Sequence, residues 1–302
     1  MVRKWKKYIP VYLMMLPGVV YLFINNYMPM AGLVAAFKQV NYSEGIWNSP
    51  WVAFKNFEFL FKTDEAFTIT RNTILYNLVF IIVGIVLGVF LAILISEVAH
   101  DKARKIYQSA VLVPFLMSIV IVSYIVYAFF SAENGLINNT ILPFFGKEAV
   151  NWYSEPKYWP FILVFVHTWK GIGYGCLIYL STINGIDRSL YEAASLDGAG
   201  KWKQIVHVTL PSLKGTIIVL TLLNIGKIFY ADFGLFYQVP MNSGQLYDVT
   251  NVIDTYVYRA LLQLGNTGMA AAAGFYQSVV GFVLVMLSNL IVRKLSPENA
   301  LF

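Results

Sequence analysis

Long apolar runs alternate with short charged stretches along the whole chain. Nearly uncharged runs cover residues 8–37, 72–96, 106–132, 158–185, 214–237 and 260–292. Each run is long enough to cross a bilayer, because a membrane-spanning helix needs about 20 mostly apolar residues. Backbone groups in lipid must also pair within the chain, which favours helices. The pattern predicts an all-α polytopic membrane protein with six transmembrane helices in a single domain, residues 1–302.

Proline and aromatic residues near the N-terminus predict departures from a simple membrane-spanning helix. Pro10, Pro17 and Pro29 lie in the first run and predict a kink or a broken start, because proline removes a helix hydrogen bond. The mixed segment that follows, residues 38–71, is typical of an amphipathic piece lying in the membrane interface, although an ordered loop with a small core of its own fits equally well. The aromatic residues behind both interpretations are Trp47, Trp51, Phe54, Phe57 and Phe61.

The distribution of Lys and Arg predicts the orientation. Six spans place both termini on one side, together with the 97–105 turn and the 187–214 loop. That side carries thirteen Lys and Arg residues, against seven on the opposite side. Cytoplasmic loops are enriched in these residues, so we expect both termini and the loop over 187–213 to be cytoplasmic.

Composition excludes several classes of protein. The chain is 58% hydrophobic and 13% charged, whereas soluble domains carry about 25% charged residues. The net charge of +6 follows the membrane topology and does not indicate nucleic-acid binding. A single cysteine, Cys176, excludes a disulfide framework. Three scattered histidines make no metal set, and no P-loop is present. We therefore expect no catalytic site, no metal and no cofactor in this chain.

The spans lack the carboxylates that ion-coupled carriers place near the membrane centre. This absence argues against a stand-alone secondary transporter, which remains an alternative. A membrane scaffold without a transport path is a further alternative, although it would not need charged residues inside its spans.

The loop between spans four and five has the signals of a short capped helix. Ser189 and Glu192 have the spacing of a capping box, which predicts a helix starting at Ser189. Gly198 and Gly200 allow left-handed conformations and a change of direction after it. A second helix is expected over 202–209, with Pro211 in the first turn of span five. This shape suits insertion into a cleft on a partner, and an ordinary solvated loop has the same signals.

The spacing within this loop resembles the EAA loop of ABC-importer permeases. Glu192-Ala193-Ala194, three residues, Gly198, nine residues and then Val208-x-Leu210-Pro211 match the family pattern, with Val208 in place of the usual Ile. The stretches LMMLPGVVYLFINNYMPMAGLVAAFKQVN and GIWNSPWVAFKNFEFLF resemble the LplB-like polysaccharide and oligosaccharide permeases, which are related to the maltose permease MalF. The resemblance covers essentially the whole chain.

The resemblance implies one of two six-span permease subunits in a type I importer of the bacterial plasma membrane. It implies a second permease (a heterodimer), two ATPase subunits that bind ATP and Mg, and an extracytoplasmic solute-binding protein. The residues that it assigns to ATPase coupling are Glu192, Ala193, Ala194, Leu196, Asp197 and Gly198. The N-terminal resemblance implies a sugar, while a permease for a non-sugar solute stays an alternative because many ABC importers share this loop.

Two lysines inside the spans suggest where a substrate passes. A lysine at the membrane centre costs at least ~2.5–3.5 kcal/mol, so Lys170 and Lys227 should face a polar cavity. Tyr174 lies one turn after Lys170, and Asn224, Lys227 and Tyr230 follow the helical spacing of a single face. These groups suit sugar hydroxyls, and two cations would favour an acidic oligosaccharide.

Each of these residues has an alternative role. Lys170 could snorkel or bond helix carbonyls around Gly171-Ile172-Gly173. Lys227 could pair with Asp232 or with the partner permease. Asn224 could join helices, and Tyr230 could be a packed aromatic residue at the interface.

Overall fold

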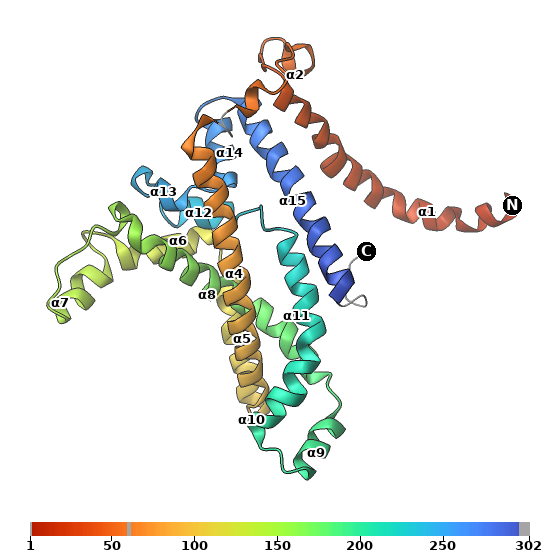
Figure 1. Ribbon diagram of the computed structural model, residues 1–302, viewed down its shortest axis with the longest axis vertical. Coiled ribbons are helices and arrows are strands. Elements are labelled where there is room, and N and C mark those ends of the chain that lie inside the picture. The colour runs from red at the N-terminus through yellow and green to blue at the C-terminus, as the bar shows by residue number, and fades with distance from the viewer. Residues whose placement is uncertain (1, 59–61, 296–302) are drawn as a thin grey trace. The chain divides into compact units, whose positions relative to one another are not determined.

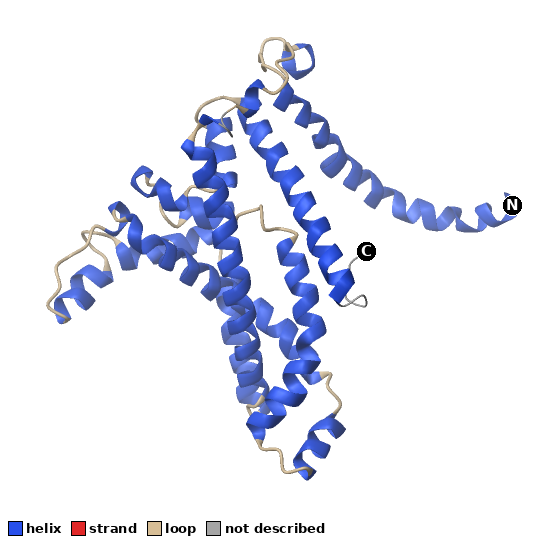
Figure 2. Cartoon of the chain, in the orientation of Figure 1, coloured by secondary structure: helices blue, strands red, loops and turns tan. Residues whose placement is uncertain are grey.

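The computed structural model describes residues 2–58 and 62–295, and it consists of helices joined by loops (Figure 2). In this part of the chain the only strand-like pairing is an isolated bridge between Lys38 and Trp51. Phe61, one of the aromatic residues noted above, lies outside the described residues. The all-α prediction is confirmed.

Five of the described helical segments are long and apolar enough to cross a membrane. They cover Tyr8–Phe37, Asp64–Ser96, Pro156–Asn184, Lys201–Ile225 and Thr267–Lys294. A sixth crossing arises if α5 (Asp101–Leu116) and α6 (Ile119–Phe130) form one bent span. The chain is thus polytopic, with five to six candidate spans in its described part.

The chain forms two compact units. The first comprises Met1–Ala66 and Tyr256–Tyr276. Its aromatic core is centred on Phe37, whose ring lies 5.4 Å from the rings of both Phe57 and Phe275. Only short helical turns occur between residues 45 and 57, and Trp47 and Trp51 are exposed. The described part of the 38–71 segment therefore begins as an ordered loop with its own small core, and α4 (Asp64–Ser96) follows it.

The second unit comprises Phe67–Thr255 and Gln277–Phe302, and α8 (Trp159–Asn184) contributes to two hydrophobic clusters in it. One cluster joins α8 to α4, α6 and α12 (Phe233–Gln238), with Trp159 and Leu163 fully buried. The other joins α8 to α4 and α11 (Leu210–Ile225) around Cys176. Figure 1 labels the remaining α-helices: α1 (Val2–Leu22), α2 (Gly45–Asn48), α7 (Leu142–Phe144), α9 (Arg188–Leu196), α10 (Lys201–Gln204), α13 (Tyr247–Thr250), α14 (Ile253–Leu262) and α15 (Thr267–Leu295).

Proline residues change the helix geometry on their N-terminal side. Pro29, Pro143 and Pro211 each follow a five-residue π-helical turn, which covers Phe23–Tyr27, Ile137–Ile141 and Ile205–Thr209 respectively. A proline cannot donate to the carbonyl four residues earlier and its ring clashes with that carbonyl. The wider turn relieves this conflict without ending the helix. Pro10 and Pro17, in contrast, lie within a continuous α1.

The predicted third span, residues 106–132, is broken. The α5 helix ends at Leu116, Met117 and Ser118 are extended, and α6 leaves at 93° to α5. Pro114 removes one hydrogen bond from the last turn of α5, and the Ser118 hydroxyl accepts from the Val120 N–H to start α6. The sequence pattern missed this break because both halves are uncharged.

A glycine allows α5 and α8 to approach closely within the second unit (Figure 1). A Cβ atom at Gly173 would lie 1.9 Å from the carbonyl oxygen of Val111, whereas one at Gly175 would meet nothing within 4 Å. No side chain other than hydrogen therefore fits at Gly173 without moving a backbone.

We expect Gly173→Ala to lower the thermal stability of the purified protein, because overpacking a tight contact costs about 1–3 kcal/mol. Gly175→Ala is the matched control on the same helix and should leave the melting temperature nearly unchanged. Melting of both variants in detergent checks this expectation, and equal melting temperatures would contradict the close contact.

Candidate coupling loop and membrane path

The helix α9 in the loop over 187–213 starts at a different residue from the one expected. Its N-cap is Asp187, whose carboxylate accepts from the Ser189 N–H at 2.9 Å. The capping box prediction with Ser189 as the cap is therefore wrong, because an equally good cap residue lies two positions earlier. The hydrogen bonds from Ser189 hold the pKa of Asp187 below its ordinary value. At a pH below this lowered pKa the carboxylate would be protonated, which would weaken the cap.

The C-terminal end of α9 is closed by a Schellman motif. The Gly198 N–H bonds the Ser195 carbonyl at 3.0 Å, and the Ala199 N–H bonds the Ala194 carbonyl at 2.9 Å. Gly198 has a φ of 78°, the left-handed conformation that this motif requires. Gly200 instead has a φ of −67° and is the N-cap of α10. The prediction of left-handed geometry is correct for Gly198 and wrong for Gly200.

The return segment is longer than the sequence pattern indicated. A single helical stretch runs from Lys201 to Ile225, so the expected helix over 202–209 merges with the following span through the π-helical turn before Pro211. Two side-chain contacts join α9 to this stretch: the Gln204 amide donates to the Ser195 hydroxyl at 2.8 Å, and the hydroxyls of Tyr191 and Thr209 lie 2.9 Å apart. These contacts make the loop an ordered projection.

The surface of this projection combines apolar and small residues. Leu196 is 89% exposed and Trp202 is 75% exposed, although both lie in a segment expected to be in water. The residues expected to couple to the ATPase are exposed as well, except for the half-buried Ala194: Glu192, Ala193, Leu196, Asp197 and Gly198. Such a surface can enter a cleft on another protein and bury apolar area there.

Lys170 lies in α8 and provides a hydrogen-bond donor for a backbone carbonyl at the C-terminal end of α5. Its ammonium donates to the carbonyl oxygen of Phe115 at 3.2 Å and lies 5.6 Å from the centre of the Phe115 ring. The last carbonyls of a helix lack partners and carry partial negative charge, which favours a cation. Tyr174, which is 55% exposed, stacks on the same Phe115 ring at 5.2 Å. The structure thus brings Lys170 and Tyr174 together around the break.

The other expected path residues lie at the end of α11. The helix ends at Ile225, so Lys227 is not near the middle of a helical span and the run predicted to Tyr237 is interrupted. The Lys227 N–H bonds the Asn224 carbonyl at 3.0 Å, and the Tyr230 N–H bonds the Lys227 carbonyl at 2.8 Å. Residues three apart stack in such turns, so Asn224, Lys227 and Tyr230 keep a shared side. All three are exposed.

The proposed pairing of Lys227 with Asp232 has no support in the structure. No ion pair between the two occurs among the described residues, and Asp232 instead caps α12 by accepting from the Leu235 N–H at 3.1 Å. An Asp at this position satisfies an otherwise unpaired helix N–H.

Three polar residues around this turn were not expected as site residues. Asn77, Asp254 and Gln277 make hydrogen bonds to the backbone between Ile228 and Ala231. Burial raises the pKa of Asp254 above its ordinary value, despite the hydrogen bonds that it accepts. The sequence contains one indication of their role, because Asn77 and Gln277 are amides inside otherwise apolar runs.

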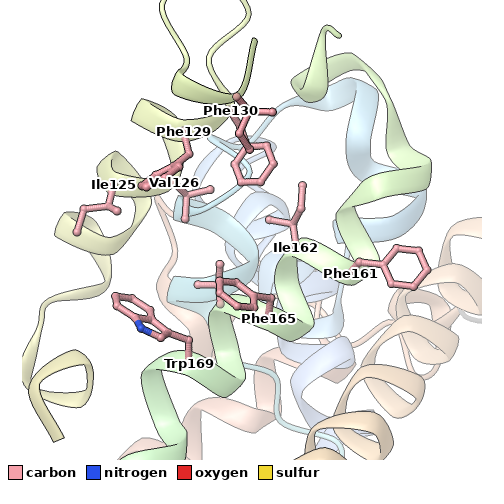
Figure 3. A pocket seen from close by; sticks show the side chains of 10 residues that line it. Ile125, Val126, Phe129, Phe130, Phe161, Ile162, Phe165 and Trp169 are labelled. Atoms are coloured by element: carbon pink, nitrogen blue, oxygen red, sulfur yellow. The ribbon is translucent and has the colours of Figure 1, made fainter. Parts of the chain in front are cut away.

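A large cavity between α6 and α8 is apolar and does not resemble a sugar site. It has a volume of about 590 Å³ and is open to one side. Figure 3 shows the side chains around it: Ile125, Val126, Phe129, Phe130, Phe161, Ile162, Phe165 and Trp169. It offers almost no hydrogen-bond partners, whereas a sugar site needs several. In the described part of the chain no group of His, Cys, Asp and Glu could hold a metal ion.

Comparisons with known proteins agree on one family. A family model described as "Binding-protein-dependent transport system inner membrane component" matches residues 84–297. The polygalacturonan/rhamnogalacturonan transport system permease protein YteP of Bacillus subtilis is 34% identical over 95% of this chain and 89% of its own length. Protein LplB of the same organism is 33% identical over 95% of this chain and 90% of its own length.

The fold also matches a solved transporter. A chain in the crystal structure of a bacterial ABC transporter involved in the import of the acidic polysaccharide alginate has a TM-score of 0.88 and 33% identity, over 97% of this chain and 99% of its own length. These matches confirm the resemblance inferred from the sequence and the type I permease fold. The chain therefore belongs to the family of binding-protein-dependent transport system inner membrane components.

Proposed function

We propose that this chain is one of two permease subunits of an ATP-driven, binding-protein-dependent importer of oligosaccharides or polysaccharides. The single observation that carries the proposal is the ordered projection formed by α9 and Gly198. It presents Glu192, Ala193 and an exposed Leu196, and nothing in the described chain covers that leucine. Family membership supports the transport role.

In this proposal the projection couples a separate ATPase to the membrane spans. The chain contains no P-loop, so two partner subunits bind ATP with Mg and hydrolyse the ATP, and the chain itself is not catalytic. The glutamate, the alanines and the turn at Asp197–Gly198 dock in a cleft on one ATPase. The contacts from α9 to the Lys201–Ile225 helix then carry the movement of the docked loop to the spans.

The substrate class rests on the relatives. YteP is named as a permease for polygalacturonan and rhamnogalacturonan, and the matched transporter of known structure is involved in alginate import. Lys170 and Lys227, with Tyr174, Asn224 and Tyr230, supply cationic, amide and aromatic groups that suit uronic acid residues. We therefore favour an acidic oligosaccharide, and a solute other than sugar is the alternative.

The family supports the remaining partners, and the Lys and Arg counts support the orientation. A solved alginate transporter is in complex with an alginate pentasaccharide-bound periplasmic protein, which supports delivery by a solute-binding protein here. We propose a heterodimer with a second permease in the bacterial plasma membrane. Both termini and the 187–213 loop face the cytoplasm, as the Lys and Arg counts predict.

Glu192→Gln should reduce ATP-driven uptake by about fivefold or more, because coupling energies between sites are typically worth at least that factor. The reconstituted transporter with its binding protein provides the measurement. Asp101→Asn is the control, since Asp101 is an exposed carboxylate expected on the same side and pairs with Arg104. Unchanged uptake in Glu192→Gln would contradict a role in coupling.

Gly198→Ala should weaken coupling through the backbone, because a left-handed conformation costs an L-residue about 1–2 kcal/mol. Gly200→Ser keeps an allowed conformation at a helix N-cap and should transport normally. Uptake per assembled complex compares the two variants. If Gly198→Ala transports as well as Gly200→Ser, the Schellman motif is not needed for coupling.

Lys227→Gln should reduce uptake of a uronic acid oligosaccharide more than uptake of a neutral oligosaccharide of the same length. Lys170→Gln should reduce both, because it also leaves the Phe115 carbonyl without its partner. Competition between the two sugars in reconstituted vesicles gives the ratio. Equal losses for both sugars in Lys227→Gln would exclude charge recognition by Lys227.

A further inference from the structure

The turn after α11 is held by side chains from three other helices. Between Ile228 and Ala231 the backbone leaves regular helical geometry, so its polar groups need partners from elsewhere. In a membrane such irregular backbone is tolerated only where protein or a water-filled cavity satisfies it. The partners of this turn therefore indicate what fixes its conformation.

Asn77 supplies the first contact. Its amide nitrogen donates to the Ile228 carbonyl at 3.0 Å and lies 3.3 Å from the Tyr230 carbonyl. The same nitrogen also bonds the Thr73 carbonyl one helical turn earlier in α4, at 2.9 Å. Asn77 lies within the membrane-crossing helix Asp64–Ser96, where an amide is unusual. One side chain thus bridges α4 and two carbonyls of the turn.

Gln277 and Asp254 supply the second contact. The buried amide of Gln277 in α15 donates to the Phe229 carbonyl and, at 3.1 Å, to the carboxylate of Asp254. The same oxygen of Asp254, at the start of α14, accepts from the Ala231 N–H at 2.7 Å. The carbonyls of Ile228, Phe229 and Tyr230 and the N–H of Ala231 are therefore all bound by side chains.

The conformation of this turn sets the positions of three exposed residues on its shared side, Asn224, Lys227 and Tyr230, which are called the strip below. These three residues are linked by hydrogen bonds between residues three apart, so their side chains follow the backbone of the turn. A small displacement of this backbone would also displace the three side chains that are proposed to contact the substrate. Misplacement of contacting groups by about 1 Å can cost a hundredfold in function.

We infer that Asn77, Asp254 and Gln277 are positioning residues that set the geometry of the Asn224–Lys227–Tyr230 strip for an oligosaccharide in transit. This inference rests on the proposed function, because it presumes that the strip lines the path. None of the three needs to touch the sugar. Their role differs from general helix packing, since each of the three side chains makes a hydrogen bond to the backbone of the turn.

Two variants remove the bonds while keeping the shape: Asn77→Leu and Gln277→Met. The control is Asn72→Leu, because Asn72 is a buried amide of the same helix that donates to the carbonyls of Asp248 and Asn251 and not to the turn. Each transporter is reconstituted with its partner permease, ATPase and binding protein. Uptake of a uronic acid oligosaccharide and ATP hydrolysis are both normalised to assembled complex.

We expect uptake per ATP hydrolysed to fall about tenfold in Asn77→Leu and Gln277→Met, which corresponds to the loss of a typical buried hydrogen bond at a site of action. Hydrolysis stimulated by the binding protein should stay within about twofold of the wild type. The control should keep the wild-type ratio of uptake to hydrolysis, even if less complex assembles, because only assembly depends on its contacts.

A purely structural role predicts a different result. Uptake and hydrolysis would then fall together in all three variants, with the ratio unchanged, and the inference would be overturned. If Asn77→Leu and Gln277→Met kept both the wild-type uptake and the wild-type ratio of uptake to ATP hydrolysis, the inference would be overturned as well. Failure of the proposed function is distinguishable, because the wild-type complex would then show no ATP-dependent sugar uptake at all.

Discussion

The pairing of every backbone polar group inside the membrane is the constraint on which this structure depends. Water cannot satisfy an open N–H or carbonyl there, so each interruption of a helix must bring its own partners. The described chain has interruptions of two kinds. At Pro29, Pro143 and Pro211 a π-helical turn precedes the proline and the helix stays continuous, while the break after α5 and the turn after α11 redirect the chain.

Polar side chains lie at both redirecting interruptions. At the break after α5, the Lys170 ammonium donates a hydrogen bond to the carbonyl of Phe115, and Tyr174 stacks on the Phe115 ring. At the second, amides and a carboxylate hold the backbone, and Lys227 stays exposed beside it. In the proposed function, the groups that pair the backbone and the groups that meet the sugar therefore lie at the same two positions, and the projection at α9 is separate from both.

The sequence predicted the class of fold and the form of the loop better than it predicted the breaks. Apolar runs and the spacing from Glu192 to Gly198 depend on local chemistry, which a sequence displays. The cap at Asp187 competes with Ser189 two residues later, and only geometry decides between them. The end of α11 before Lys227 depends on partners from α4, α14 and α15 that are distant in sequence, so periodicity extended the helix too far.

Site-specific photo-crosslinking can detect the proposed contact between α9 and an ATPase subunit. A photoreactive residue replaces Leu196, which is 89% exposed, in the complete transporter in native membranes. The same residue at Leu264 is the control, because Leu264 is 69% exposed and precedes the last candidate span, Thr267–Lys294, whose start is expected on the side opposite to the cytoplasm. We predict an adduct with the ATPase subunit from position 196 and none from position 264. The absence of an ATPase adduct at position 196, in complexes that contain the ATPase, would contradict the account.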